Sequence, residues 1–191
     1  MSKPVRYWLF KSEPECFSIR HLEAAPNRTT FWDGVRNFQA RNFLRDEIRP
    51  GDRVLYYHSN AEPSAVAGTA TVVQAGYPDP TAQDPESDHY DPKHTALSPI
   101  WYMVDIRLDE IFPRELPLDE LRRVPELKDM ELLRKGSRLS VQPVRKSEFE
   151  AVLKRARAEP DAAKPSAVES ARPKTSGTAA TTRRRRRERS G

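Results

Sequence analysis

The chain has 191 residues, of which 33 are Lys or Arg and 28 are Asp or Glu, so its formal net charge at pH 7 is +5. This length fits one ordinary domain with an appendage rather than two full domains. The charge is uneven, since residues 1–155 carry 23 basic and 24 acidic side chains, whereas residues 156–191 carry 10 and 4. These counts exclude a domain that coats nucleic acid by charge alone, so residues 1–155 must recognise a partner by shape and chemistry.

No apolar run approaches the roughly 18 to 20 residues that span a bilayer, and the first residues lack a secretory apolar stretch with a small-residue cleavage site. Cys16 is the one cysteine of the chain, which excludes an intramolecular disulfide and a site with several thiolate ligands. We therefore expect a soluble intracellular protein, cytoplasmic and associated with the nucleoid in a bacterium, or nuclear in a eukaryote. We expect no cofactor and no metal, and we favour a monomer.

Helices and strands mix without regular alternation. In chain order, hydrophobic spacing and turn residues predict a strand at 6–11, helices at 19–25 and 38–48, strands at 53–58, 65–75 and 101–112, helices at 118–124 and 126–135, a strand at 139–144 and a helix at 147–155. Ser18 and Ser147 are expected to cap the helices that follow them. Phe38, Leu44 and Ile48 form an approximate helical stripe. The sum predicts an α+β fold whose strands form a compact, partly closed barrel with peripheral helices.

Two segments are predicted to lack regular structure. Residues 77–99 contain five prolines and form a long loop, which in a compact domain is usually functional or mobile. Residues 156–191 contain no aromatic side chain and end in a run of arginines, Arg183–Arg187. Such a tail buries too little apolar surface to fold, and we predict that it is disordered. Such a run is usually a solvated tail, and it can at the same time attract phosphates without sequence preference.

Four segments carry motifs that, in this order, make a chance match very improbable. They are YWLFKSEP at 7–14, WDGVRNFQARN at 32–42, YHSN at 57–60 and GSRLSVQP at 136–143. With these motifs the chain resembles the EVE domain family from residue 6 to about 153. The resemblance implies a PUA-like fold related to the YTH readers of N6-methyladenine. It also implies binding of modified bases, notably modified cytosine in DNA.

The WDGVRN segment places an aromatic ring beside a carboxylate, a guanidinium and a primary amide, within a turn that Gly34 permits. Trp32 could stack on an extruded base, a contact of roughly 1 to 3 kcal/mol, which about balances the few kcal/mol that flipping costs. The residues alone leave open a core tryptophan with a satisfied N–H. The resemblance to YTH readers favours Trp32 as a wall of the base cage and places Lys11 and Ser12 at its rim, while Trp8 is expected in the core.

We therefore predict a non-enzymatic reader that flips a modified cytosine of DNA into an aromatic pocket, with RNA bases as a further possibility. The pocket is predicted to consist of Lys11, Ser12, Glu13, Trp32, Asp33, Val35, Asn37, Tyr57, Ser59 and Asn60. The residues predicted to contact phosphate or sugar are Lys11, Arg36, Arg41 and Arg138. The loop at 77–99 could close over the base as a lid through Tyr90 or Tyr77.

Two other classes stay open. Lys11, Ser12 and Glu13 could activate a hydroxyl for hydrolysis of a modified nucleoside, as in ASCH-type relatives of the PUA-like group, although adjacent strand residues point to opposite faces. A protein-interaction adaptor would bind no nucleic acid. The acids and histidines between Asp84 and His94 match no zinc or EF-hand spacing, so hydrated loop carboxylates explain them better than a metal site.

Overall fold

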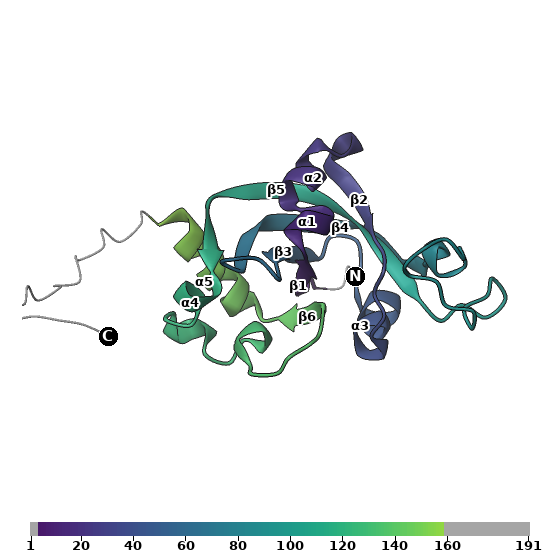
Figure 1. The fold of residues 1–191 in the computed structure, drawn as a ribbon. Coiled ribbons are helices and arrows are strands. Elements are labelled where there is room, and N and C mark those ends of the chain that lie inside the picture. Colours follow the sequence, from purple (N-terminus) through teal and green to yellow (C-terminus); the bar gives the residue numbers. More distant parts are fainter. Residues whose placement is uncertain (1–3, 159–191) are drawn as a thin grey trace, which may run out of the picture. The chain divides into compact units, whose positions relative to one another are not determined.

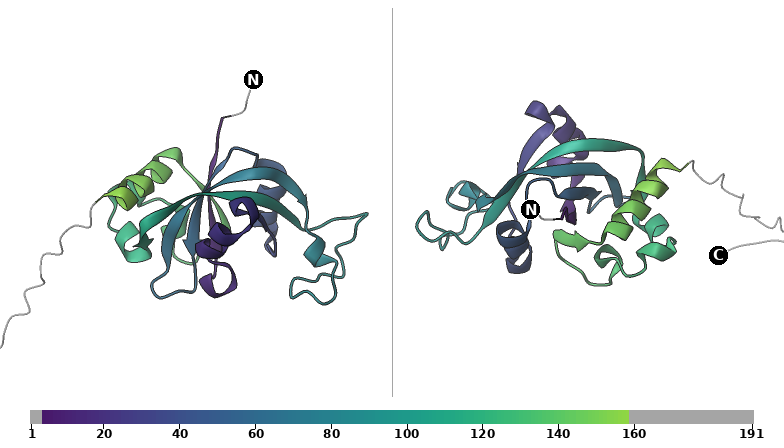
Figure 2. Two further views of the ribbon diagram at one scale, coloured as in Figure 1. Left: turned by 90° about the horizontal axis from the view of Figure 1, so that it is seen from above. Right: turned by 180° about the vertical axis from the view of Figure 1, so that it is seen from behind.

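The computed structural model of the chain describes residues 4–158. Its six strands form one sheet in the order β2-β5-β4-β3-β1-β6, in which β1 and β3 are parallel and the other neighbours are antiparallel (Figure 1). The strands are β1 (Tyr7–Ser12), β2 (Thr29–Trp32), β3 (Arg53–His58), β4 (Ala65–Pro78), β5 (Tyr102–Pro117) and β6 (Val141–Val144). The long strands β4 and β5 curve across the domain, and the sheet curls with β2 and β6 as its edges (Figure 2). Together with the helices described next, this sheet confirms the predicted α+β class.

Short helices flank this sheet, and four of them form two pairs. They are α1 (Pro14–Phe17), α2 (Ile19–Ala24), α3 (Phe38–Asn42), α4 (Leu118–Leu121) and α5 (Lys146–Arg157). The helices α1 and α2 lie together beside β2 and β5, whereas α4 and α5 lie together at the other end of β5 (Figures 1 and 2). The pair α1–α2 follows directly after β1, which brings the end of β1 close to β2.

The sheet separates two hydrophobic cores because successive side chains on a strand point to opposite faces. On β1, Trp8 and Phe10 join the core beneath α2, α3 and β2. Leu9 joins the core beneath α4 and α5. The strand β3 alternates in the same way, with Tyr56 in the first core and Tyr57 in the second. Trp8 is 1% exposed, which confirms that it is a core residue.

The predicted strands are all confirmed, and β4 and β5 extend beyond them. The strand β2 was not predicted, although its sequence TTFW is rich in strand-forming residues. The helix predicted at 126–135 is wrong, because the segment folds as two 3₁₀ turns, Pro125–Leu127 and Glu131–Leu133. Their buried residues Leu127 and Leu132 pack into the second core, and that tertiary packing overrides local helix propensity.

The helix starts are partly as predicted. Ser18 caps α2 in a reciprocal capping box with His21. The helix α5 instead begins after Arg145, whose backbone N–H donates to Glu148 at 2.8 Å, so Ser147 is not its cap. The helical stripe at 38–48 is interrupted, because α3 passes into a π-helical turn at Phe43–Glu47 and Phe38 is 60% exposed.

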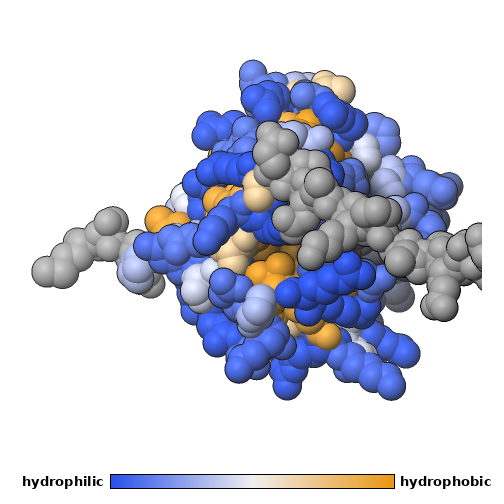
Figure 3. Space-filling model, turned by 90° about the vertical axis from the view of Figure 1, so that its left-hand side faces the viewer, coloured by the Kyte–Doolittle hydropathy of each residue, from blue (hydrophilic) through white to orange (hydrophobic). Residues whose placement is uncertain are grey.

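The predicted disordered tail begins at residue 156, but α5 continues to Arg157 with Ala156 buried, so these residues belong to the domain. The remainder of that prediction lies outside the described residues. No helix within residues 4–158 has both the length and the apolar character to cross a membrane. The side of the domain that carries α4 and α5 is hydrophilic over most of its visible face, with small hydrophobic patches (Figure 3).

Candidate nucleic-acid interface

A cavity of about 540 Å³ opens where β1 and β2 end. Six of the predicted pocket residues line it, namely Lys11, Ser12, Glu13, Trp32, Asp33 and Val35. The residues that were not predicted are Cys16, Phe17, Thr30, Phe31, Gly34, His89 and Ser140. The backbone explains how distant segments meet here, since Lys11 N donates to Ser140 O at 2.8 Å and joins β1 to the segment that precedes β6.

Trp32 differs from the other two tryptophans in the state of its indole N–H. Trp8 donates to Asp52 Oδ2 at 3.0 Å and Trp101 donates to Asp91 Oδ2 at 2.7 Å. Within residues 4–158, the Trp32 N–H has no acceptor, and it is not sealed from solvent although the residue is only 7% exposed. A buried tryptophan usually satisfies its N–H. The open N–H of Trp32 therefore sets it apart from a purely structural tryptophan.

The Trp32 ring is held by aromatic neighbours on the core side. The Phe10 ring centroid lies 5.1 Å away, and the Tyr56 ring meets it edge-on at 5.5 Å. Tyr56 is fixed in turn, because its hydroxyl donates to the Phe17 carbonyl at 2.7 Å. Burial raises the pKa of Tyr56, so that hydroxyl stays protonated. The indole is thus clamped from behind while it lines the cavity.

Two charged groups line the cavity without a neutralising contact. Burial lowers the pKa of Lys11, an effect that Glu131 partly opposes. Burial also raises the pKa of Asp33, and the nearby Asp79 carboxylate adds to that shift. No other residue among 4–158 hydrogen-bonds to either side chain or forms an ion pair with it. Partly buried charged groups without a partner in a cleft, such as Lys11 and Asp33, are candidates for contact with a ligand.

The long loop contributes His89 to the lining of the cavity through a close contact at Gly34. Its φ is +69°, and a Cβ there would lie 2.5 Å from the His89 ring. Asp79 fixes this approach from beneath, because its Oδ2 accepts from Gly34 N at 3.2 Å and from Arg36 Nη1 at 2.9 Å. Glycine at 34 is therefore required both by the backbone conformation and by the space that His89 occupies.

Asp79 itself is a fully buried carboxylate. Burial alone would raise its pKa, but hydrogen bonds from Thr81, Arg36 and Gly34 N outweigh burial and hold the pKa below its ordinary value. Arg36 also donates to the His89 carbonyl, with Nε at 3.0 Å. The two loops that bound the cavity are thus tied together by one ion pair.

Four predicted pocket residues do not line the cavity. Asn37 is exposed and caps α3, where its Oδ1 accepts from Gln39 N and Ala40 N. Tyr57 packs into the second core, because strand alternation turns it away from the face that Tyr56 occupies. Ser59 serves through its backbone, whose N–H donates to Ser12 O at 2.9 Å.

Asn60, the fourth of these residues, supports the cavity indirectly. Its Nδ2 donates to Glu13 Oε1 at 2.5 Å, so it orients a lining carboxylate. Its φ of +51° is one that asparagine tolerates better than most residues. Asn60 is therefore a positioning residue for Glu13.

The three predicted phosphate-binding arginines differ in whether their guanidinium groups already have partners within the described part of the protein. Arg36 is committed to Asp79 and His89, so it builds the cavity wall. Arg41 donates to the Ile100 carbonyl and stacks on Phe38, with 5.1 Å to the ring centroid. Arg138 is exposed and has no ion pair within the part of the chain that the structure describes. It lies two residues before Ser140, which lines the cavity.

The long loop does not contribute Tyr77 or Tyr90. Tyr77 belongs to β4, and its hydroxyl donates to Asp105 Oδ1 at 2.5 Å. Tyr90 is exposed and does not line the cavity. The ring that the loop does place there is that of His89. Arg36 donates to the carbonyl of His89 itself and Trp101 donates to Asp91, so the loop is anchored at this residue and two residues beyond it.

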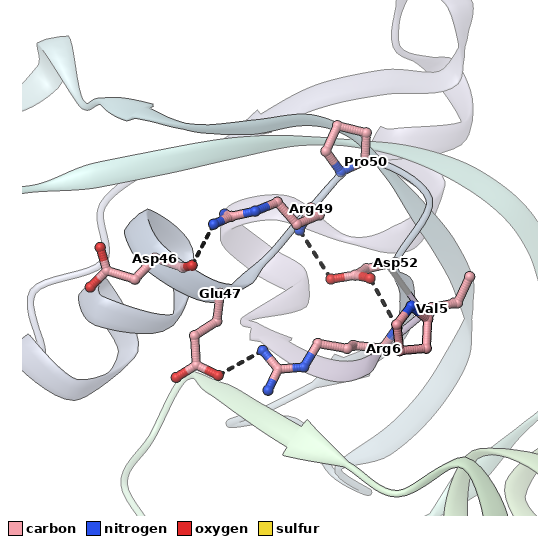
Figure 4. A pocket seen from close by; sticks show the side chains of 8 residues that line it. Val5, Arg6, Asp46, Glu47, Arg49, Pro50 and Asp52 are labelled. Atoms are coloured by element: carbon pink, nitrogen blue, oxygen red, sulfur yellow. Dashed lines mark hydrogen bonds and ion pairs between the residues drawn. The ribbon is translucent and has the colours of Figure 1, made fainter. Parts of the chain in front are cut away.

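A second hollow of about 630 Å³ lies between the start of β1 and the residues that precede β3 (Figure 4). Its charged groups satisfy one another. Asp52 accepts from the backbone N–H of Arg6 and of Arg49 and from the Trp8 indole, while Arg6 forms an ion pair with Glu47 at 2.7 Å. This hollow is a structural junction, whereas the smaller cavity holds the unpaired charges. Residues 4–158 contain no group of acids, histidines and cysteine suited to a metal ion.

Comparison with known proteins agrees with this architecture. The model of the EVE domain matches residues 6–155. The chain belongs to the EVE domain family. Human thymocyte nuclear protein 1 is 40% identical over 171 residues, which cover 81% of this chain and 75% of the human protein. The zebrafish (Danio rerio) protein of the same name is 43% identical over 163 residues, covering 76% and 70% of the two chains.

Solved structures of EVE domain relatives match as well. The structure of human THYN1 in complex with DNA that contains 5-methylcytosine has a TM-score of 0.77 and 40% identity, covering 81% of this chain and 99% of that chain. A protein from Pseudomonas syringae has a TM-score of 0.75 and 43% identity, covering 78% and 99%. The family resemblance drawn from the four motifs is thereby confirmed.

Proposed function

We propose that this EVE domain is a non-enzymatic reader of DNA that flips a modified cytosine, 5-methylcytosine in the first place, into the cavity between β1 and β2. The observation that carries the proposal is the Trp32 indole, which lines the cavity, packs against Phe10 and Tyr56, and has no acceptor for its N–H within residues 4–158. The relative crystallised with DNA containing 5-methylcytosine supports the choice of ligand.

In this proposal the residues around the cavity make three kinds of contact with DNA. Trp32 stacks on the extruded base, and Lys11, Ser12 and Asp33 face its polar edge. Arg138 contacts the backbone beside the cavity, and the basic segment that follows Arg157 adds affinity that is independent of sequence. Arg36 and Asn37 build the site rather than touch the base.

Flipping a base costs a few kcal/mol, and one stacking contact returns roughly 1 to 3 kcal/mol. The edge contacts and backbone contacts must therefore supply the surplus. A methyl group that fills an apolar gap contributes about 0.8 kcal/mol, so selectivity for the methylated base over cytosine should be about fourfold.

A hydrolase built on Lys11, Ser12 and Glu13 has less support. Glu13 is already engaged by Asn60, and the Tyr56 hydroxyl donates to the Phe17 carbonyl. A hydroxyl nucleophile needs a base within hydrogen-bond distance to remove its proton, and within residues 4–158 neither Lys11 nor Glu13 forms a side-chain hydrogen bond with Ser12.

The exposed ring of Phe31 gives a test that leaves the core intact. Phe31 lines the cavity and is 54% exposed, whereas Phe38 is similarly exposed but lies outside it. We expect Phe31→Ala to weaken binding of an oligonucleotide containing 5-methylcytosine by about tenfold, because the ring covers the base or fills the gap that it leaves. The measurement is fluorescence anisotropy with a labelled duplex.

The matched variant Phe38→Ala should bind within about twofold of the wild type, since its ring packs on Trp101 away from the cavity. Equal losses in the two variants would point to a general surface effect. If neither variant changes the affinity and 5-methylcytosine and cytosine bind alike, the proposed function is wrong.

A further inference from the structure

The cavity contains two acidic side chains in different states. The Glu13 carboxylate is occupied, because Asn60 donates to it at 2.5 Å. The Asp33 carboxylate accepts no hydrogen bond from another residue within 4–158, although it lies in the loop that directly follows the Trp32 wall. Asp33 is thus the lining acid whose oxygens are available to a ligand.

Charged groups lie near Asp33, but none within residues 4–158 forms an ion pair with its carboxylate. Asp79 disfavours its charge, while His89 and Arg36 favour it. Arg36 is committed to Asp79, with Nη1 at 2.9 Å from Oδ2. The Asp33 oxygens therefore remain available to accept a hydrogen bond from an N–H donor of a ligand in the cavity.

The two pyrimidines that carry a 5-methyl group differ at the polar edge. Methylated cytosine presents an amino donor at position 4, whereas thymine presents a carbonyl acceptor there. A carboxylate accepts from the cytosine amino group but meets the thymine carbonyl as one acceptor against another. Lys11, a donor on the same cavity, complements the acceptor that cytosine carries at N3.

We propose that Asp33 is the specificity-determining residue that selects a 4-amino pyrimidine over a 4-keto pyrimidine, so that this domain rejects thymine even though thymine carries the same methyl group. The inference rests on the proposed function, because it needs the base in the cavity beside Trp32. It assigns selectivity for the base to Asp33, separately from any selectivity for the methyl group.

The experiment uses the full chain and four single-stranded oligonucleotides that differ only at one central base, which is cytosine, 5-methylcytosine, uracil or thymine. Single strands remove the cost of unpairing, and the four bases separate the effect of the amino group from that of the methyl group. We expect 5-methylcytosine to bind about tenfold more tightly than thymine, and cytosine to exceed uracil by a similar factor.

In Asp33→Asn the ratio between 5-methylcytosine and thymine should fall to within about twofold, because an amide offers either a donor or an acceptor. The matched variant Asp119→Asn should keep the wild-type ratio, since Asp119 is an exposed carboxylate of α4 that pairs with Arg122 and does not line the cavity. Equal binding of 5-methylcytosine and thymine by the wild type, or an unchanged ratio in Asp33→Asn, would overturn the assignment.

Failure of the proposed function has a different signature from failure of this assignment. If the cavity does not read bases, all four oligonucleotides bind alike and Phe31→Ala changes none of them. If the domain reads bases but Asp33 does not select them, 5-methylcytosine exceeds cytosine while thymine binds as tightly as 5-methylcytosine. The second pattern retains the reader and rejects only the role of Asp33.

Discussion

Replacing Trp32 by alanine should weaken binding of DNA containing 5-methylcytosine by about five- to 150-fold, the equivalent of one lost base stack of roughly 1 to 3 kcal/mol. The ring also packs on Phe10 and Tyr56, so the same change should destabilise the fold by about 3 to 5 kcal/mol. Affinity comes from anisotropy and stability from urea unfolding, at a temperature where the variant is folded.

A pair of milder variants separates binding from folding. Trp32→Phe and Trp8→Phe each keep an aromatic ring and each shrink the first core. Trp8 has no contact with the cavity, and its N–H is taken by Asp52. We expect both variants to lose stability but only Trp32→Phe to lose affinity. A parallel loss of affinity in Trp8→Phe would mean that the core, rather than an open indole, governs binding.

The second large effect is expected at Asp79. Asp79→Asn removes the charge that pairs with Arg36 and leaves Gly34 N or Thr81 facing an amide donor. Breaking a buried ion pair costs about 3 kcal/mol or more. Because the loops of Gly34 and His89 are joined through this pair, the cavity should lose a wall and affinity for 5-methylcytosine DNA should fall about tenfold.

Asp52→Asn is the matched control, since Asp52 is also buried and accepts three hydrogen bonds, but in the hollow of Figure 4. It should lose comparable stability in urea unfolding while its affinity stays within about twofold of the wild type. Retained affinity in Asp79→Asn, or an equal loss in Asp52→Asn, would contradict the role given to the Asp79–Arg36 pair.

Acid should act on the Asp79 contribution in a defined direction. Because the pKa of Asp79 is held below its ordinary value of 3.8, the stabilisation is complete above that value and is lost as the pH falls through the lower pKa of the folded state. The stability that Asp79 contributes to this wall of the cavity should therefore not change with pH in the neutral range.

Hydrophobic spacing and turn residues predict most strands of the sheet, and the elements that they predict wrongly have physical causes. The strand β2 is four residues long and follows Pro26, so its TTFW sequence gives too short a signal for period two. The segment 126–135 has the composition of a helix, yet Pro125 and the burial of Leu127 and Leu132 favour two tighter turns. Such choices depend on the core and not on the segment itself.

The lining of the candidate cavity was predictable where motif residues lie near the end of a strand, as Lys11 does on β1 and Trp32 does on β2. Tyr57 could have been set aside from strand alternation, because Tyr56 already faces the Trp32 side. Asn37 could have been recognised as a cap from its place just before a helix. His89 had no local signal, since only the tertiary contact with Gly34 brings it to the cavity.

The central claim is that the modified base enters the cavity between β1 and β2, and Cys16 tests it most directly. Cys16 is exposed, lines this cavity and is the one thiol of the chain, so a small alkylating reagent reports on that place alone. At saturation, DNA containing 5-methylcytosine should slow alkylation by about tenfold relative to the free protein, whereas DNA with an abasic site at the same position should leave the cavity empty and slow it far less. Equal alkylation rates in the two saturated complexes would contradict the account.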